Sequence, residues 1–266
     1  MSKVIAIAGA TGQQGGATIR ALAGQGFTLR ALTLDGFFGQ PVSGEFDTGL
    51  VGDGQQVQHS IGAATERRGD SDGVLERLLG HDHALGAKIG QFVPAHPIAG
   101  REQNGPEAAL GDLYVGKKVI LTPLIENAPE AIARVANAWT QCGALIHRLD
   151  AAEHDAVFAA VSHLPHLLAY ALVDDIAARP NAETLFQYAA SGFRDFTRIA
   201  GSSPEMWRDI ALANRSALLS ELDSYIKQVA QLRECLSQKD SAGLETIFTR
   251  ARDARQGWCG YEHPPR

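Results

Sequence analysis

Cysteine is scarce in this chain and follows no recognisable spacing. The 266 residues include three cysteines, Cys142, Cys235 and Cys259, which is an odd number without a C-x-x-C pair. Disulfide frameworks and small zinc modules need paired or closely spaced cysteines. We therefore expect reduced thiols and a cytoplasmic protein.

An excess of basic charge and long apolar runs are also missing. The chain has 24 Lys and Arg against 30 Asp and Glu, a net charge of -6, which gives no electrostatic case for nucleic acid or an anionic membrane. No apolar run approaches the roughly 20 residues of a membrane-spanning helix, and the short N-terminal run leads directly into glycines, unlike a secretory signal. We expect no nucleic-acid and no membrane partner, while a small anionic ligand stays open.

A βαβ pattern is present at the N-terminus. Residues 3–8 and 27–33 predict strands, and residues 16–22 predict a helix between them. A glycine-rich turn after the first strand lets phosphate oxygens approach N–H groups at the positive end of the helix. The candidate cofactor-binding residues in this turn are Gly9, Thr11, Gly12, Gln13, Gln14 and Gly15. The alternative is a tight turn without a ligand.

The G-x-x-G-x-x-G spacing of this turn resembles the opening of NmrA-like reductases, over residues 1–33. The resemblance implies NAD(P) binding. In that family a basic residue after the second strand often holds the 2′-phosphate of NADP, but Leu34 and Asp35 stand there in this chain. An acidic side chain suits a free ribose 2′-hydroxyl, so Asp35 favours NAD over NADP.

The composition changes after this opening. Residues 36–75 are rich in glycine, glutamine, serine and charge, and predict no strand. Strands are predicted at 89–93, 119–122 and 144–147, a helix at 128–142, and helices almost throughout after residue 150. We therefore expect an α/β nucleotide-binding domain over residues 1–149, Rossmann-like but abbreviated, followed by an all-α dimerisation domain over residues 150–266.

Two apolar helical stripes in the second half are the reason to expect a dimer. They comprise Val157, Val161, Leu164, Leu168 and Leu172 on one helix, and Leu212, Leu219, Leu222, Ile226, Val229 and Leu236 on another, longer one. Stripes of this length need cover, so we expect a homodimer formed through the C-terminal helices.

The first candidate chemical cluster is the loop over residues 91–105, which follows a predicted strand. It contains His96 between proline and glycine residues. Imidazole titrates near neutrality, so this histidine can accept a proton or hydrogen bond from a substrate hydroxyl. The alternative is a histidine with a purely structural hydrogen bond.

The second cluster is the segment over residues 162–166. Pro165 is expected to kink the helix, and His163 and His166 can share one polar face with Ser162 and Tyr170. A ligand-facing surface is one interpretation, and a solvated face is the other. A metal site is not expected because two histidines lack a third ligand at a fitting distance.

The third cluster is the segment over residues 192–209. Arg194 and Arg198 stand four residues apart, so a helix would place two guanidinium groups on one face, where they suit bidentate binding of carboxylates. The alternative is a set of surface ion pairs with the neighbouring aspartates.

Together these three segments resemble the motifs of prephenate dehydrogenases over residues 89–258: H-P-I-A-G-x-E, S-H-L-P-H and G-F-R-D-x-T-R-I-A followed by W-R-D. The resemblance implies that His96 is the catalytic histidine and that Arg198 binds a substrate carboxylate. It implies further pocket positions at His166 and Arg194, a gating acid at Glu102, and Trp207 near the pocket.

The implied reaction is the NAD-dependent oxidative decarboxylation of prephenate or arogenate in tyrosine biosynthesis. Two alternatives stay open: an NmrA-like NAD(P)-binding sensor, and a helical dimerisation module without catalysis. Before the histidine loop, in residues 1–90, the chain has neither the V-P strand end nor the D-x-G-S-x-K segment that members of the family normally carry there. An abbreviated nucleotide domain would weaken cofactor binding, so impaired turnover is one outcome to test.

Overall fold

The computed structural model describes residues 3–8, 13–25, 27–32, 90–99 and 110–258. The strands are β1 (Lys3–Ala8), β2 (Phe27–Leu32), β3 (Ala95–Pro97), β4 (Lys118–Leu121) and β5 (Leu145–Arg148). The helices are α1 (Gln13–Leu22), α4 (Pro129–Gln141), α5 (Ala151–Phe158), α6 (Leu164–Ala177), α7 (Ala182–Gln187), α8 (Ser191–Thr197), α9 (Pro204–Ala213), α10 (Arg215–Ser237) and α11 (Ser241–Gly257). The predicted irregular segment 36–75 lies outside the described residues.

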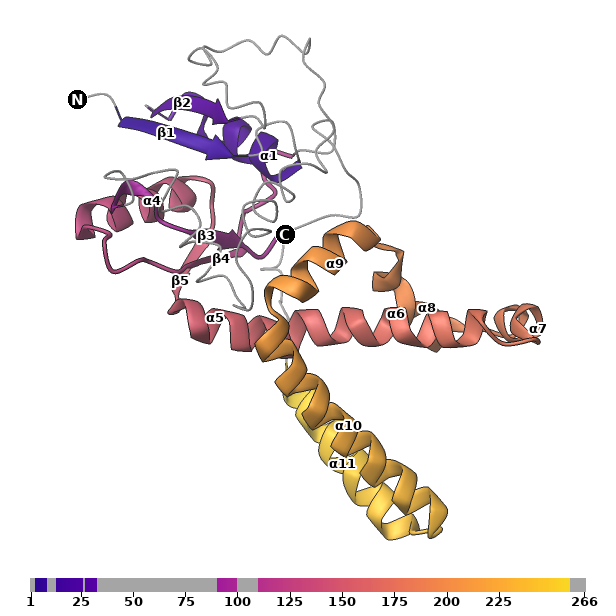
Figure 1. Ribbon diagram of the computed structural model, residues 1–266. Coiled ribbons are helices and arrows are strands. Elements are labelled where there is room, and N and C mark those ends of the chain that lie inside the picture. Colours follow the sequence, from indigo (N-terminus) through magenta and orange to yellow (C-terminus); the bar gives the residue numbers. More distant parts are fainter. Residues whose placement is uncertain (1–2, 9–12, 26, 33–89, 100–109, 259–266) are drawn as a thin grey trace.

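The N-terminal half is an α/β layer with two sheets in the part that the structure describes (Figure 1). β1 and β2 pair in parallel, from Lys3 opposite Phe27 to Ala8 opposite Leu32, with α1 between them in the chain. In the second sheet, β4 is central: β3 runs antiparallel to it and β5 parallel. The predicted βαβ opening, the helix at 128–142 and the strands at 119–122 and 144–147 are confirmed within a few residues.

A buried core joins α1 to the second sheet and to α4. Tyr114 and Leu121 have no exposed surface, and Leu22 of α1 is equally enclosed. The Tyr114 ring packs edge-on against Trp139 of α4 at 5.0 Å between centroids, and the Thr18 hydroxyl of α1 donates to the Tyr114 oxygen at 3.3 Å. The two N-terminal segments therefore share one hydrophobic core.

The prediction of a strand at residues 89–93 is wrong for its described residues. Gly90 and Gln91 form a short 3-10 turn, and the strand begins only at Ala95. The buried Asn127 side chain explains the difference, because its amide donates to the carbonyls of Gly90 and Phe92 at 3.3 and 2.9 Å. These carbonyls are satisfied by a side chain instead of a neighbouring strand.

The C-terminal half is helical and extended (Figure 1). α5, a π-helical turn over Ala159–His163 and α6 form one continuous rod. Pro165 lies in the first turn of α6, where its missing N–H is tolerated. The helix kink that Pro165 was expected to cause takes the form of the π turn just before it. α10 and α11 form a hairpin that projects away from this rod.

The rod Ala151–Ala177 bears on the expectation that no segment is long and apolar enough to span a membrane. By length and composition it could cross a membrane, with a mean hydropathy of 1.6, although the sequence has no uninterrupted apolar run of that length. A core helix of a soluble protein passes the same test. Its apolar positions include Val157 and Val161, which are 40% and 68% exposed in the single chain. Only 17% of that apolar window is buried within the single chain, so the rod is not a helix of the chain's own core.

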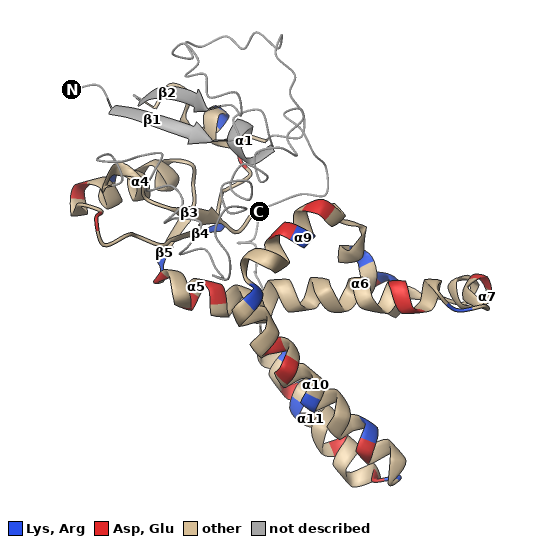
Figure 2. Ribbon diagram, viewed as in Figure 1, with Lys and Arg blue, Asp and Glu red and all other residues tan. Residues whose placement is uncertain are grey.

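The long C-terminal helix that the second apolar stripe predicted is divided. α9 ends at Ala213 and α10 begins at Arg215, with Asn214 between them outside helical geometry. Along α10 and α11, acidic and basic side chains are interleaved (Figure 2). The described residues of this hairpin therefore carry no basic tract of the kind that binds nucleic acid.

Gly143 provides a test of how tightly β5 is connected to α4. Its φ of +82° is left-handed, and a Cβ there would lie 2.9 Å from Cγ2 of Val115. Gly143→Ala should lower the free energy of unfolding by at least ~1–2 kcal/mol, because the left-handed cost adds to the clash. Urea denaturation checks this. Gly192→Ala is the control, since nothing lies within 4 Å of that position. Equal stability of the two variants would contradict the fold described for this turn.

Candidate active site

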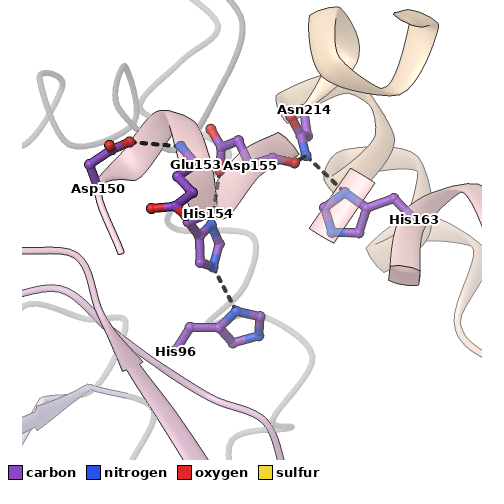
Figure 3. Close-up of polar contacts among 7 residues, drawn as sticks. All are labelled: His96, Asp150, Glu153, His154, Asp155, His163 and Asn214. Atoms are coloured by element: carbon purple, nitrogen blue, oxygen red, sulfur yellow. Dashed lines mark hydrogen bonds and ion pairs between the residues drawn. The ribbon is translucent and has the colours of Figure 1, made fainter. Parts of the chain in front are cut away.

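His96 lies at the junction between the sheet and the helical rod. It sits in β3 opposite Ile120 of β4, and Figure 3 shows its ring facing α5. Its Nδ1 is 2.9 Å from Nε2 of His154, and its ring centroid is 4.8 Å from that of Phe158. The catalytic candidate named from the sequence is thus held by two residues of α5.

His154 continues the contact to a buried carboxylate. Its Nδ1 lies 3.0 Å from Oδ1 of Asp155, and the two residues are only 6% and 8% exposed. Their position on α5 is set locally: Asp150 caps the helix by accepting a hydrogen bond from the Glu153 N–H at 2.7 Å. A line of three polar groups, Asp155, His154 and His96, therefore runs from the helical rod to the end of the sheet (Figure 3).

Asn214 ties this line to the break between α9 and α10. Its amide nitrogen donates to the backbone carbonyl of Asp155 at 2.8 Å and lies 3.1 Å from Nδ1 of His163. Asn214 is 4% exposed, so its polar atoms need such partners. The interruption of the predicted long helix thus coincides with a residue that connects α10, α5 and the π turn.

The surroundings of His96 make its imidazole a weak base. Burial of the ring, together with smaller unfavourable electrostatic interactions with His154 and His163, lowers the pKa of His96 from 6.5 to about 4. Part of the residue stays exposed to solvent, while the Nδ1 edge is enclosed by His154 and Phe158. At neutral pH His96 is therefore uncharged and can accept a proton.

A second polar cluster lies along the π turn, α6 and α9. His166 stacks on Trp207 with 3.4 Å between ring centroids and an interplanar angle of 18°, and its Nδ1 lies 3.0 Å from the Ser162 carbonyl oxygen. Burial lowers the pKa of His166, and the nearby positive charge of Arg198 acts in the same direction. The buried Nε1 of Trp207 has no hydrogen-bond partner among the described residues.

The other predicted site residues are distributed as follows. Arg194 is on α8 with a 77% exposed side chain, 3.5 Å from Asp195, and Arg198 begins the 3-10 turn after that helix. Gln13, Gln14 and Gly15 form the first turn of α1. The remaining candidates, Gly9, Thr11, Gly12, Asp35 and Glu102, lie outside the described residues. Among the described candidates, the structure brings His163 and His166 to the same ring of Trp207, at 6.1 and 3.4 Å between centroids. Arg198 acts electrostatically on His166, and His163 acts electrostatically on His96.

The sequence reasoning missed three residues of this site: His154, Asp155 and Asn214. A signal for the first two exists, because Glu153, His154 and Asp155 form a polar stretch inside the otherwise apolar run over residues 151–161. Asn214 carries no such signal, since asparagine near a helix boundary is common wherever a chain changes direction.

The titration of His96 can be measured directly. We expect its ring protons to shift in an NMR titration with a midpoint near pH 4, because the atoms packed against the ring remove part of its water and so disfavour the charged form. The folded pKa lies below the unfolded one, so between about pH 6.5 and pH 4 only the unfolded chain binds this proton. This group therefore lowers stability as the pH falls through that window. His96→Gln assigns the signal, and a midpoint near 6.5 would contradict the geometry.

Comparison with known proteins places both halves in one family. A model of the prephenate dehydrogenase nucleotide-binding domain matches residues 70–148, and a model of the prephenate dehydrogenase dimerization domain matches residues 150–250. A cyclohexadienyl dehydrogenase of Zymomonas mobilis is 39% identical over 166 residues, and a prephenate dehydrogenase of Bacillus subtilis is 38% identical over 168 residues.

These matches cover 62% and 63% of this chain but only 57% and 45% of the two relatives, so the matched part is about half of each relative. Among solved structures, prephenate dehydrogenase from Aquifex aeolicus in complex with hydroxyphenyl propionate and NAD+ is similar over 97% of this chain and 98% of its own. The TM-score is 0.75 at 27% identity. The resemblance inferred from the three motifs is confirmed. The chain therefore belongs to the prephenate dehydrogenase family, with its nucleotide-binding domain followed by its helical dimerisation domain.

Proposed function

We propose that this chain catalyses the NAD-dependent oxidative decarboxylation of prephenate, or of arogenate, in tyrosine biosynthesis in the cytoplasm. The observation that carries the proposal is the uncharged imidazole of His96, held by hydrogen bonding to His154 within a chain of this family. Such an imidazole accepts the proton of the ring hydroxyl as the ring is oxidised, and returns it to the phenolate oxygen once loss of carbon dioxide has made the ring aromatic.

The β1–α1–β2 unit fits a dinucleotide. β1 and β2 pair in parallel, and α1 starts at Gln13, five residues after the end of β1, where the helix dipole favours a pyrophosphate. We propose that the cofactor is held there by Gly9, Thr11, Gly12, Gln13, Gln14 and Gly15, with Asp35 on the ribose. When bound, NAD+ supplies the acceptor for the hydride that leaves the ring.

The second polar cluster is the proposed place for the anionic groups of the substrate. Arg198 acts on the charge of His166, so the two side chains are electrostatic neighbours, and Trp207 offers a buried N–H donor beside them. A guanidinium group and an indole N–H suit carboxylate oxygens, and Arg194, His163 and Glu102 are further candidates for this pocket. Preference for a keto or an amino side chain would be decided by these contacts.

We also propose that two copies of the chain associate through the helical half. Large apolar side chains on the hairpin are exposed in the single chain: Leu219 at 49%, Ile226 at 55%, Leu236 at 66% and Phe248 at 58%. An exposed apolar strip along two helices is costly in water and gains free energy when a second copy covers it. The family's domain model is itself described as a dimerization domain.

The dimer can be tested on α10. Ile226→Lys should shift the protein from dimer toward monomer in size-exclusion chromatography with light scattering at micromolar concentration, because a charge would be placed in an apolar contact. Gln231→Lys is the matched control, since it adds the same charge at an exposed polar position of the same helix. A wild-type protein that is monomeric at this concentration would contradict the proposed interface.

The enzymatic activity can be tested at His96. His96→Asn should lower kcat by about 10²–10⁴, the usual contribution of a general base, because an amide hydrogen-bonds without taking a proton. The assay is the prephenate-dependent rise of NADH absorbance. His147→Asn, at an exposed position of β5, is the control and should keep wild-type kcat. A nucleotide sensor would bind NAD without this rise, and a purely helical interaction module would do neither.

A further inference from the structure

The function proposed above uses the contact of His154 with His96 but gives Asp155 no role, although His154 and Asp155 are only 6% and 8% exposed. We propose that Asp155 and His154 are positioning residues that fix the tautomer of His96, with Nδ1 protonated and Nε2 kept as the proton acceptor. The inference rests on the proposed function for its catalytic meaning, while the tautomer itself is a property of the folded chain.

The assignment follows from which atoms can donate. An ionised aspartate only accepts hydrogen bonds, so the 3.0 Å contact to Oδ1 of Asp155 requires a proton on Nδ1 of His154. In a neutral imidazole the other nitrogen, Nε2, is then an acceptor. The 2.9 Å contact between this Nε2 and His96 requires the proton on Nδ1 of His96. The Nε2 of His96 therefore keeps its lone pair.

The packing holds these contacts in one arrangement. His154 and Asp155 are 6% and 8% exposed, and the Phe158 ring packs against His154 and His96 at 4.5 and 4.8 Å between centroids. Asn214 donates to the backbone carbonyl of Asp155 from the start of α10. Side chains enclosed in this way lose little entropy on reaction and interact with weak solvent screening.

The electrostatic consequence concerns the protonated state. When the substrate O–H bond breaks and the N–H bond forms at Nε2, His96 becomes positively charged. Burial of the ring opposes that charge. The Asp155 carboxylate is the compensating anion on α5, one imidazole away, and it acts without taking the proton itself, as the aspartate of serine-protease triads does.

Asp155→Asn tests the proposal, because the amide NH2 can donate to Nδ1 of His154 and reverse both tautomers. Nε2 of His154 would then donate to Nδ1 of His96, leaving the proton of His96 on Nε2. The corresponding change in serine proteases lowers kcat by about 10⁴ through the wrong tautomer. We expect kcat for prephenate to fall by about 10²–10⁴, while KM for prephenate and Kd for NAD+ stay within about twofold.

The matched control is Glu153→Gln. It removes one negative charge from the same helical turn, at an exposed position beside the buried pair, and should leave kcat unchanged. Circular dichroism and light scattering verify that each variant keeps its fold and assembly. A folded Asp155→Asn protein with kcat within about threefold of wild type would overturn the proposal.

A second measurement does not depend on turnover. In protein labelled with ¹⁵N-histidine, the His96 ring at neutral pH should show a protonated Nδ1 and an unprotonated Nε2, with the pattern reversed in Asp155→Asn and retained in Glu153→Gln. Finding Nε2 protonated in the wild type would overturn the proposal even if the enzyme is active. If the wild type shows the expected tautomer but forms no NADH from prephenate, the proposed function is wrong while the tautomer assignment holds.

A variant pair at the central residue covers the case in which Asp155→Asn fails to fold. His154→Gln keeps a carbonyl oxygen that can accept the Nδ1 proton of His96, whereas His154→Leu removes every acceptor. We expect His154→Gln to retain at least about tenfold more kcat than His154→Leu. Equal kcat in the two variants would mean that His154 serves packing only and would contradict the positioning role.

Discussion

The hydrogen bond between His96 and His154 is the contact on which the site depends, because it joins the sheet to the helical rod. β3 is only three residues long, and its pairing with β4 positions the backbone of His96 but leaves the ring free to rotate about its side-chain bonds. Orientation of the ring therefore comes from α5. The proposed catalytic group is thus placed by the sheet and oriented by the helical rod, and the Phe158 ring strengthens the connection between the two by packing against both imidazoles.

The helices of the C-terminal half are irregular at the points where they make this connection. A single helix through Asn214 would be the simplest way to present the apolar stripe of α10, yet helical geometry is interrupted at this residue. A π turn also interrupts the rod, at Ala159–His163. Both irregularities carry polar atoms that meet: the Asn214 amide lies between the Asp155 carbonyl and His163. Departures from regular helix at such points are typical of functional sites, since a regular helix would direct these groups elsewhere.

Local patterns explain what could be predicted from the sequence. The β1–α1–β2 opening and α4 follow from short-range apolar periodicity, and the three long motifs carried the family. The strand expected at 89–93 failed because Asn127, more than thirty residues away, satisfies its carbonyls. His154 escaped notice for the same reason: its importance comes from a partner 58 residues distant, and no spacing rule within α5 encodes that distance.

A base with a pKa of about 4 looks poorly matched to an alcohol, which is a far weaker acid than protonated imidazole. The mismatch disappears if the hydroxyl becomes acidic only as the hydride leaves its carbon, because the developing carbonyl oxygen then releases its proton readily. On this view the low pKa keeps His96 uncharged throughout the physiological range, and the Asp155–His154 pair lowers the cost of the brief positive charge. In the proposed reaction, His96 would therefore serve as a weak acceptor that is always available, whereas a stronger base would be partly protonated at neutral pH. Proton transfer would then accompany hydride departure instead of preceding it.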